Sequence, residues 1–333
     1  MKRKYLVLCD KEEEYTNLMT EFISNHKELP WNILSYTDSD KLLNGEQQRD
    51  IALLLVSEST YTEQLKELKA KRIVILSESG RKNEEGYPHI FKYQPAAGVL
   101  KELLEVYMEI GEEQEKAVFI PQRKARIIGI YSPVRRCLQT TFALTLAQML
   151  SEKAPTLYMN FEHYAGMTEI LPDVQTRDLA DLLYFLNLNQ ENFNLRMQTI
   201  IQHKGCLDYI PPMKAGQNLL TVTGAEWLLL LKKLEETSEY QYIILDLSEC
   251  VQGLFDLLRA CCRIFTLTKD DRVARAKLLQ YEQMLQLYAY EDVLQKTNML
   301  TTPFIRRLPE EMELYTKGEM ADFVRTQLKQ VIS

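Results

Sequence analysis

The chain has 333 residues, of which 46% are apolar and 26% are charged, so it is long enough for two ordinary globular domains. Its formal net charge of −7 argues against a dedicated nucleic-acid binder, which would carry a basic surface. No apolar run approaches the roughly 20 residues that a membrane-spanning helix requires. These properties predict a cytoplasmic protein without a membrane span.

Residues 1–112 alternate short apolar strands with amphipathic helices. Such alternation predicts a doubly wound parallel sheet, because each parallel crossover needs a helix. We expect helices over residues 12–26, 60–71 and 96–113. The strands are expected at Tyr5–Asp10, Trp31–Tyr36, Ile51–Ser57, Arg72–Ser77 and His89–Tyr93.

The order and spacing of these elements resemble a response-regulator receiver domain. A phosphorylatable receiver requires an acidic pair after its first strand, an aspartate at the end of its third and a lysine after its fifth. Asp10 matches the acidic corner, but the third strand ends at Ser57, and Lys92 lies two residues from the usual lysine–proline pairing. The resemblance therefore implies a pseudoreceiver that serves as a protein-docking or dimerisation module. A second interpretation makes Asp10 only the N-cap of the helix that starts near Glu12.

Residues 113–125 are charged and polar, so they predict a short linker ahead of a second domain over residues 126–333. That domain opens with a β-branched strand, Arg126–Tyr131, then a short loop, and then a helix that begins with Thr140 and Thr141. A strand, a loop and a helix N-terminus in this order form the layout of a phosphate-binding loop.

The loop resembles that of the ParA/MinD group of deviant P-loop ATPases, which reads close to S-P-K-G-G-x-G-K-T-T. Residues 132–141 retain both ends of this pattern, but its three glycines and two lysines are replaced. Glycines let backbone amides approach phosphate oxygens, and the lysine before the threonines neutralises phosphate charge. The resemblance therefore implies the fold of an ATPase without its hydrolysis. The candidate nucleotide-binding residues are Arg135, Arg136, Cys137, Leu138, Gln139, Thr140 and Thr141.

The basic pair in this loop has two interpretations. Arg135 and Arg136 either bind a phosphate as counter-ions or form only a solvated basic loop. Val134 replaces the lysine that family members extend across a dimer, so an ATP-dependent clamp is not expected. A constitutive homodimer is expected instead, through the receiver-like half or through apolar surface that replaces the nucleotide site.

Two later strands carry the remaining candidates. One ends near Asn160 and Glu162, where the family has an aspartate that helps to organise magnesium and the attacking water. The other lies within residues 240–249 and is a continuous apolar run that ends in Asp246, which is typical of a Walker B motif. Asp246 and Thr140 would then hold Mg²⁺. Alternatively, Asp246 only bonds the amides of the loop that follows.

Further elements complete the second domain. Helices are expected at residues 178–186 and 273–287, and strands at 207–212 and 263–271. The closing segment GEMADFVRTQLKQVI is amphipathic, so it either packs on the core or forms a weak interfacial membrane helix.

A receiver-like domain followed by a MinD-like domain resembles the TadZ/CpaE group, which comprises localisation and assembly factors of the tight-adherence (Flp) pilus. The expected fold class is therefore α/β, a receiver-like doubly wound parallel sheet followed by a MinD-like P-loop NTPase domain. The resemblance implies a non-catalytic scaffold that marks a site, often a cell pole, and recruits pilus secretion components.

Two alternatives to the scaffold stay open. The first is a regulator that binds ATP or ADP with magnesium without cleaving it, and the second is an atypical weak ATPase. The expected partners in every case are proteins, with no nucleic acid and at most a weak peripheral contact with a membrane. The expected location is the cytoplasm, with partners drawing the protein to a pole or towards the membrane.

Overall fold

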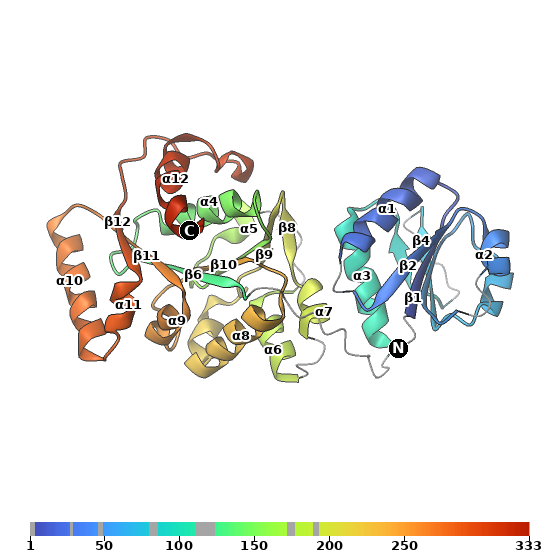
Figure 1. Cartoon of the computed structure of the whole chain (residues 1–333), viewed down its shortest axis with the longest axis horizontal. Coiled ribbons are helices and arrows are strands. Elements are labelled where there is room, and N and C mark those ends of the chain that lie inside the picture. Colours follow the sequence, from blue (N-terminus) through green and yellow to red (C-terminus); the bar gives the residue numbers. More distant parts are fainter. Residues whose placement is uncertain are drawn as a thin grey trace. The chain divides into compact units, whose positions relative to one another are not determined.

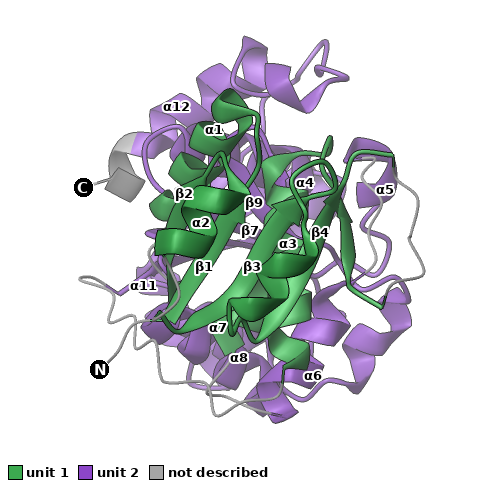
Figure 2. Cartoon of the chain, turned by 90° about the vertical axis from the view of Figure 1, so that its right-hand side faces the viewer, with its two compact units in different colours: residues 1–118, 191–199 green, residues 119–190, 200–333 purple. Residues whose placement is uncertain are grey.

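The computed structural model describes residues 4–26, 29–45, 49–79, 86–110, 124–171, 177–188 and 193–332. The chain divides into two compact units, which Figure 2 colours separately. The first unit comprises residues 1–118 and 191–199, and the second comprises residues 119–190 and 200–333. Most of the predicted linker at 113–125 lies outside the described residues.

The first unit is built on five parallel strands in the order β2-β1-β3-β4-β5. This 2-1-3-4-5 order is that of a doubly wound, flavodoxin-like sheet, so the predicted fold class is confirmed for this unit. The central strand β3 is buried at every residue, as expected for a sheet covered on both faces. The strands are β1 (Lys4–Cys9), β2 (Trp31–Tyr36), β3 (Ile51–Ser57), β4 (Arg72–Ser77) and β5 (His89–Phe91).

Two apolar clusters lie on opposite faces of this sheet, because successive side chains of a strand point to opposite sides. Leu53 and Leu55 belong to the cluster that α1 and α3 cover. Leu54 and Val56 belong to the cluster that α2 covers with Leu42. The helices are α1 (Glu13–Asn25), α2 (Ser39–Gly45) and α3 (Ala96–Glu109).

One predicted helix of the first unit is wrong. Residues 60–71 contain only a 3₁₀ turn, η1 (Glu63–Glu67). From this segment only Leu65 and Leu68 are buried in the apolar cluster, and a single short turn is enough to place two residues three apart. The residues after this turn lead directly into β4.

The first unit also contains a helix that the sequence boundaries assign to the second domain. This helix is α7 (Phe193–Gln198), and residues 191–199 around it group with the first unit. Leu195 of α7 joins the same apolar cluster as α1 and α3, which explains the grouping.

The second unit has a seven-stranded sheet in the order β12-β11-β6-β10-β7-β9-β8. All neighbouring pairs are parallel except β9 with β8, which are antiparallel. The predicted α/β class is therefore confirmed here too. The strands are β6 (Arg126–Tyr131), β7 (Thr156–Asn160), β8 (Gln202–Lys204), β9 (Leu207–Ile210), β10 (Tyr242–Asp246), β11 (Arg263–Thr268) and β12 (Thr297–Thr301).

Helices cover both faces of the second sheet (Figure 1). On one face α4 (Gln139–Ser151) packs against the strands and under α12 (Gly318–Ile332). On the other face α8 (Gly224–Thr237) contacts α9 (Leu254–Ala260). The other helices and turns are α5 (Met167–Ile170), α6 (Leu179–Leu188), η3 (Gly216–Thr221), α10 (Arg272–Leu287), α11 (Glu291–Gln295) and η4 (Met312–Leu314).

The two interpretations of the C-terminal helix are resolved in favour of core packing. Met320, Ala321, Val324 and Leu328 of α12 are buried in the same apolar cluster as α4. These buried residues form the apolar stripe of α12, which therefore packs on the protein core.

Within the described part of the chain, no helix combines the length and apolarity needed to cross a membrane.

Candidate functional site

The P-loop-like segment lies at the carboxyl ends of the central strands of the second sheet. It follows β6, which pairs with β10 and β11, and it leads into α4. In open α/β sheets this edge is where ligands bind. The segment therefore occupies the position that a phosphate site requires.

Three residues of the loop adopt left-handed backbone conformations that normally favour glycine. Their φ angles are 63° at Arg135, 51° at Arg136 and 57° at Leu138. These are the three positions at which the ParA/MinD pattern has glycines. Each left-handed non-glycine residue costs roughly 1–2 kcal/mol, so the rest of the structure must hold this shape in place. The backbone form of a phosphate loop is therefore retained without its glycines.

Hydrogen bonds within the loop fix its first turn, and the first amides of α4 lack a side-chain cap. Ser132 Oγ accepts hydrogen bonds from the amides of Val134 and Arg135, both at 3.2 Å, and so fixes the start of the turn. At the N-terminus of α4, Leu138 occupies the cap position and supplies no side-chain hydrogen bond to the helix amides. Successive amides in such a turn form a concave donor surface that suits an oxyanion.

Gln139 occupies the position of the P-loop lysine and is bonded within the protein. Its Nε2 donates to Asp246 Oδ1 at 2.5 Å and to the carbonyl of Leu247 at 2.8 Å. The side chain thereby joins the first turn of α4 to the end of β10. An amide that makes these bonds carries no charge and cannot neutralise a phosphate.

Asp246 is fully buried at the end of β10, and both of its carboxylate oxygens accept hydrogen bonds. Tyr158 donates its hydroxyl to Oδ2 at 3.0 Å, and Asn160 donates Nδ2 to the same oxygen at 3.0 Å. Burial raises the pKa of Asp246, while the bonds from Gln139, Thr140, Tyr158 and Asn160 act in the opposite direction. The carboxylate is therefore stabilised by side chains. The second interpretation, in which it bonds the amides of the following loop, does not describe its contacts.

The residues proposed for magnesium do not fit that ion in this arrangement. Mg²⁺ requires near-octahedral oxygen ligands and keeps several waters. Asp246 has no exposed surface, and the donors around it present hydrogens where a cation would lie. Thr140 also directs its side chain to Asp246. In the segments that the structure describes, no group of three His, Cys, Asp or Glu residues could hold a metal ion.

A cavity of about 460 Å³ opens in front of the loop. Six of the seven predicted nucleotide-binding residues line it, while Cys137 is buried beneath the loop and donates its Sγ hydrogen to the carbonyl of Arg135 at 3.1 Å. Arg135 forms an ion pair with Glu249 across the cavity mouth. The exposed guanidinium of Arg136 has no ion-pair partner among the described side chains.

Several lining residues were not among the predicted set. Glu249 follows Asp246 by three positions in the loop after β10, and His163 and Tyr164 follow the end of β7. Glu162, which the sequence had already marked as a candidate, also lines the cavity, and burial, with the nearby charge of Asp246, raises its pKa to about 7. The signal that could have identified Glu249, His163 and Tyr164 is their place, since they follow the carboxyl ends of β10, which neighbours the P-loop strand, and of β7, the next strand in the sheet.

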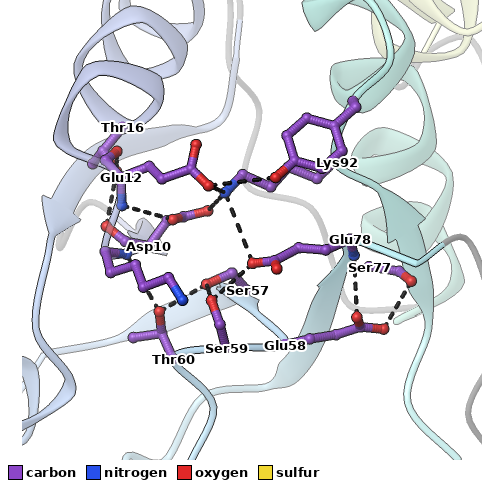
Figure 3. A network of polar contacts seen from close by, with 12 residues as sticks. Asp10, Glu12, Thr16, Ser57, Glu58, Ser59, Thr60, Ser77, Glu78 and Lys92 are labelled. Atoms are coloured by element: carbon purple, nitrogen blue, oxygen red, sulfur yellow. Dashed lines mark hydrogen bonds and ion pairs between the residues drawn. The ribbon is translucent and has the colours of Figure 1, made fainter.

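In the first unit, Lys92 and Asp10 form a buried ion pair at the corresponding edge of the sheet (Figure 3). Lys92 Nζ lies 2.6 Å from Asp10 Oδ2 and 2.8 Å from Glu12 Oε1, and the side chains of Lys92 and Asp10 are wholly buried. Burial alone would lower the pKa of Lys92, but the hydrogen bonds to Asp10 and Glu12 outweigh it and raise that pKa. Although Lys92 lies two residues from the expected lysine–proline pairing, its ammonium therefore contacts the acidic residues that follow β1.

The alternative role of Asp10 as the helix N-cap is wrong. The N-cap of α1 is Glu12, whose amide donates to Asp10 Oδ1 at 2.9 Å. Asp10 thus orients the turn between β1 and α1 while its other oxygen pairs with Lys92.

The end of β3 carries hydroxyls in place of a phosphorylatable carboxylate. Ser57 Oγ lies 2.7 Å from Thr60 Oγ1, and Ser59 donates to Glu78 at 2.8 Å (Figure 3). The adjacent carboxylate, Glu58, accepts from Ser77 Oγ at 2.8 Å and so is directed towards the end of β4. A continuous polar network therefore closes this edge of the sheet.

Comparison with known proteins identifies similar solved structures. No protein-family model matches the chain, and no curated protein matches it. A ParA family ATPase from Chlorobium tepidum TLS has a TM-score of 0.44 and 18% identity over 53% of this chain and 73% of that one. A putative plasmid partition protein from Borrelia burgdorferi B31 bound to AMPPNP has a TM-score of 0.45 and 15% identity, over 62% of this chain and 100% of that one.

The MinC:MinD cell division protein complex of Aquifex aeolicus is a third similar structure. Its TM-score is 0.41 and its identity 12%, over 60% of this chain and 78% of that one. Because these TM-scores are all below 0.5, the α/β assignment rests on the strand orders and the loop geometry described above.

The left-handed conformation at Arg136 predicts an unusual order of stability. Replacement of Arg136 by glycine should give a protein about 1 kcal/mol more stable than replacement by alanine, because only glycine adopts φ 51° without strain. Urea unfolding of the two variants measures the difference. The same pair of replacements at exposed Arg275, inside α10, is the control and should show the opposite order by about 1 kcal/mol. Greater stability of the alanine variant at position 136 would contradict the loop geometry.

The buried ion pair of the first unit predicts a large effect of Lys92→Met. Loss of the ammonium leaves Asp10 buried and unpaired, which should lower the free energy of unfolding by about 3 kcal/mol. Trp31 lies in the first unit, so its fluorescence in a Trp227→Phe background reports this unit. The exposed pair of Lys66 with Glu63 provides the control, since Lys66→Met should cost less than about 1 kcal/mol. Equal losses in the two variants would refute the role of the pair.

Proposed function

We propose that this protein is a ParA/MinD-like localisation or scaffold protein that does not hydrolyse nucleotides. The observation that carries the proposal is the hydrogen bond between Gln139 and Asp246. In a working site the residues at these two positions serve phosphate and magnesium. Here they bind one another inside the protein, and the carboxylate has no exposed surface. Hydrolysis would require both groups to be released.

The more specific role is that of a TadZ/CpaE-like factor of pilus assembly. Its support is the combination of a flavodoxin-like first unit with a second unit that carries a P-loop-like segment. The first unit has the Lys92–Asp10 pair of a receiver but a hydroxyl, Ser57, where the phosphorylated carboxylate would be. A protein in which both units lack their reactive groups acts through contacts with partner proteins or with a second copy of itself.

A second candidate, a regulator that binds a nucleotide without cleaving it, is favoured by one separate observation. The loop has left-handed turns, the first amides of α4 have no side-chain cap, and Arg136 lines a cavity of about 460 Å³. An oxyanion bound there would be held by amides and a guanidinium without a metal ion.

The test is a calorimetric titration of the purified protein with ATP and ADP, with and without magnesium, together with a turnover assay. We expect no turnover and no magnesium-dependent binding, because Asp246 is not available to the metal. Micromolar binding that is indifferent to magnesium and is lost in Arg136→Gln would favour the regulator. Turnover that Asp246→Asn abolishes would refute the proposal.

A second variant tests whether the missing glycines and lysines are the reason that nucleotide binding is absent. It restores the family pattern by the changes Val134→Lys, Arg135→Gly, Arg136→Gly, Leu138→Gly and Gln139→Lys. Because the backbone already has the required left-handed turns, this variant should gain nucleotide binding that the natural chain lacks.

A further inference from the structure

An aromatic groove lies between α9 and α10 of the second unit, beside the start of the P-loop-like segment. Its cavity is about 830 Å³. Figure 1 shows α9, α10 and α11 at the β12 end of the sheet. The groove is lined mainly by aromatic rings and one thioether, which belong to Tyr131, Phe255, Tyr281, Met284, Tyr288 and Tyr290.

The apolar surface continues along α10 beyond the groove. Tyr288 is 58% exposed and Met284 is 40% exposed, although both are large and apolar in most of their surface. Leu287 lies three residues from Met284 on the same helix and is 76% exposed. A contiguous exposed apolar patch on a soluble protein marks an interaction site more often than single exposed residues do.

The rings hold one another in position, so the groove exists without a partner. Phe255 lies 5.4 Å from Tyr290 and 6.1 Å from Tyr281, and Tyr131 lies 5.4 Å from Tyr281, all measured between ring centroids. Tyr290 also donates its hydroxyl to Asp256 at 2.6 Å. Preorganised aromatic side chains of this kind lose little entropy on binding and are enriched at interaction hot spots.

The charges at the groove favour an acidic partner. Glu249 already pairs with Arg135, and Asp256 accepts from Tyr290 and lies near Arg259. Lys277, the remaining charged side chain of the lining, has no ion-pair partner among the described residues. Each carboxylate of the groove thus has an ion-pair or hydrogen-bond partner within the chain, whereas the ammonium of Lys277 has no ion-pair partner among the described residues.

We propose that this groove docks an amphipathic helix of a partner protein, whose apolar face carries aromatic or aliphatic side chains and whose flank is acidic. The apolar face packs into the groove against Phe255 and Tyr288, and an acidic residue pairs with Lys277. Helices bind in grooves in this way through apolar residues spaced three and four apart. The inference goes beyond the proposed function, because it holds whether or not the P-loop cavity takes a nucleotide.

The test measures binding of the full chain to three labelled peptides of about 16 residues, roughly four helical turns, by fluorescence anisotropy. The first is an amphipathic helix with leucine and phenylalanine on one face and glutamate on the flank. The second has lysine in place of each glutamate, and the third has serine in place of each apolar residue. We expect the first to bind at least tenfold more tightly than either of the others.

Variants of the chain locate the binding site. Tyr288→Ser should weaken the acidic peptide about tenfold or more, and Lys277→Glu about threefold to tenfold. Phe304→Ser removes an 88% exposed apolar side chain outside the groove, and Lys153→Glu reverses an exposed charge elsewhere, and neither should have an effect.

Three outcomes would overturn the proposal. These are equal binding of all three peptides, tighter binding of the basic peptide, and binding that survives Tyr288→Ser. Sedimentation of the chain alone tests the remaining occupant. Self-association that Tyr288→Ser abolishes would show that a second copy fills the groove and would also refute the acidic partner.

Discussion

A buried carboxylate organises the centre of the second unit. Asp246 lies at the end of a central strand with no exposed surface, and donors from both neighbouring elements converge on it. Gln139 approaches from the first turn of α4, while Tyr158 and Asn160 approach from β7. A charge in this position would cost several kcal/mol without such partners, so their placement is a condition for the fold. The polar groups of this carboxylate are thereby satisfied by the chain's own side chains.

The same physical arrangement recurs in the first unit with the charges exchanged. There the buried ammonium of Lys92 is held by Asp10 and Glu12 at the carboxyl ends of parallel strands. In both units the buried charge at this edge of the sheet is therefore held by side chains of the same unit. Arg135, Arg136 and Leu138 keep left-handed backbone conformations that glycine would adopt without strain.

The sequence predicted the parts of the fold that depend on local apolar pattern. The buried strands Ile51–Ser57 and Tyr242–Asp246 are continuous apolar runs, and both are confirmed. The edge strand β12 was missed because its residues are only partly buried and alternate without a clear apolar face. Residues 60–71 have helical composition, but too few of them reach the core to sustain a helix.

The sequence indicated where the candidate site lies, but it did not predict which side chains contact one another there. The loop and Asp246 were identified as partners from their resemblance to known motifs, and six of the seven loop residues do line one cavity. The hydrogen bond between Gln139 and Asp246 could not be predicted, because the two residues are 107 positions apart in the sequence. Gln139 was considered only as a missing positive charge, whereas its amide is a donor that a buried carboxylate needs.

The most direct test of this account is a double-mutant cycle between Gln139→Leu and Asp246→Asn, measured as free energies of unfolding in urea. Each single change removes one side of the charged hydrogen bond, so the two losses should overlap. If the two side chains are bonded, their coupling energy should be about 1 kcal/mol or more, as expected for a hydrogen bond to a buried charge. Losses that add to within about 0.5 kcal/mol would show that the two side chains act independently, and that the nucleotide site is not closed by this bond.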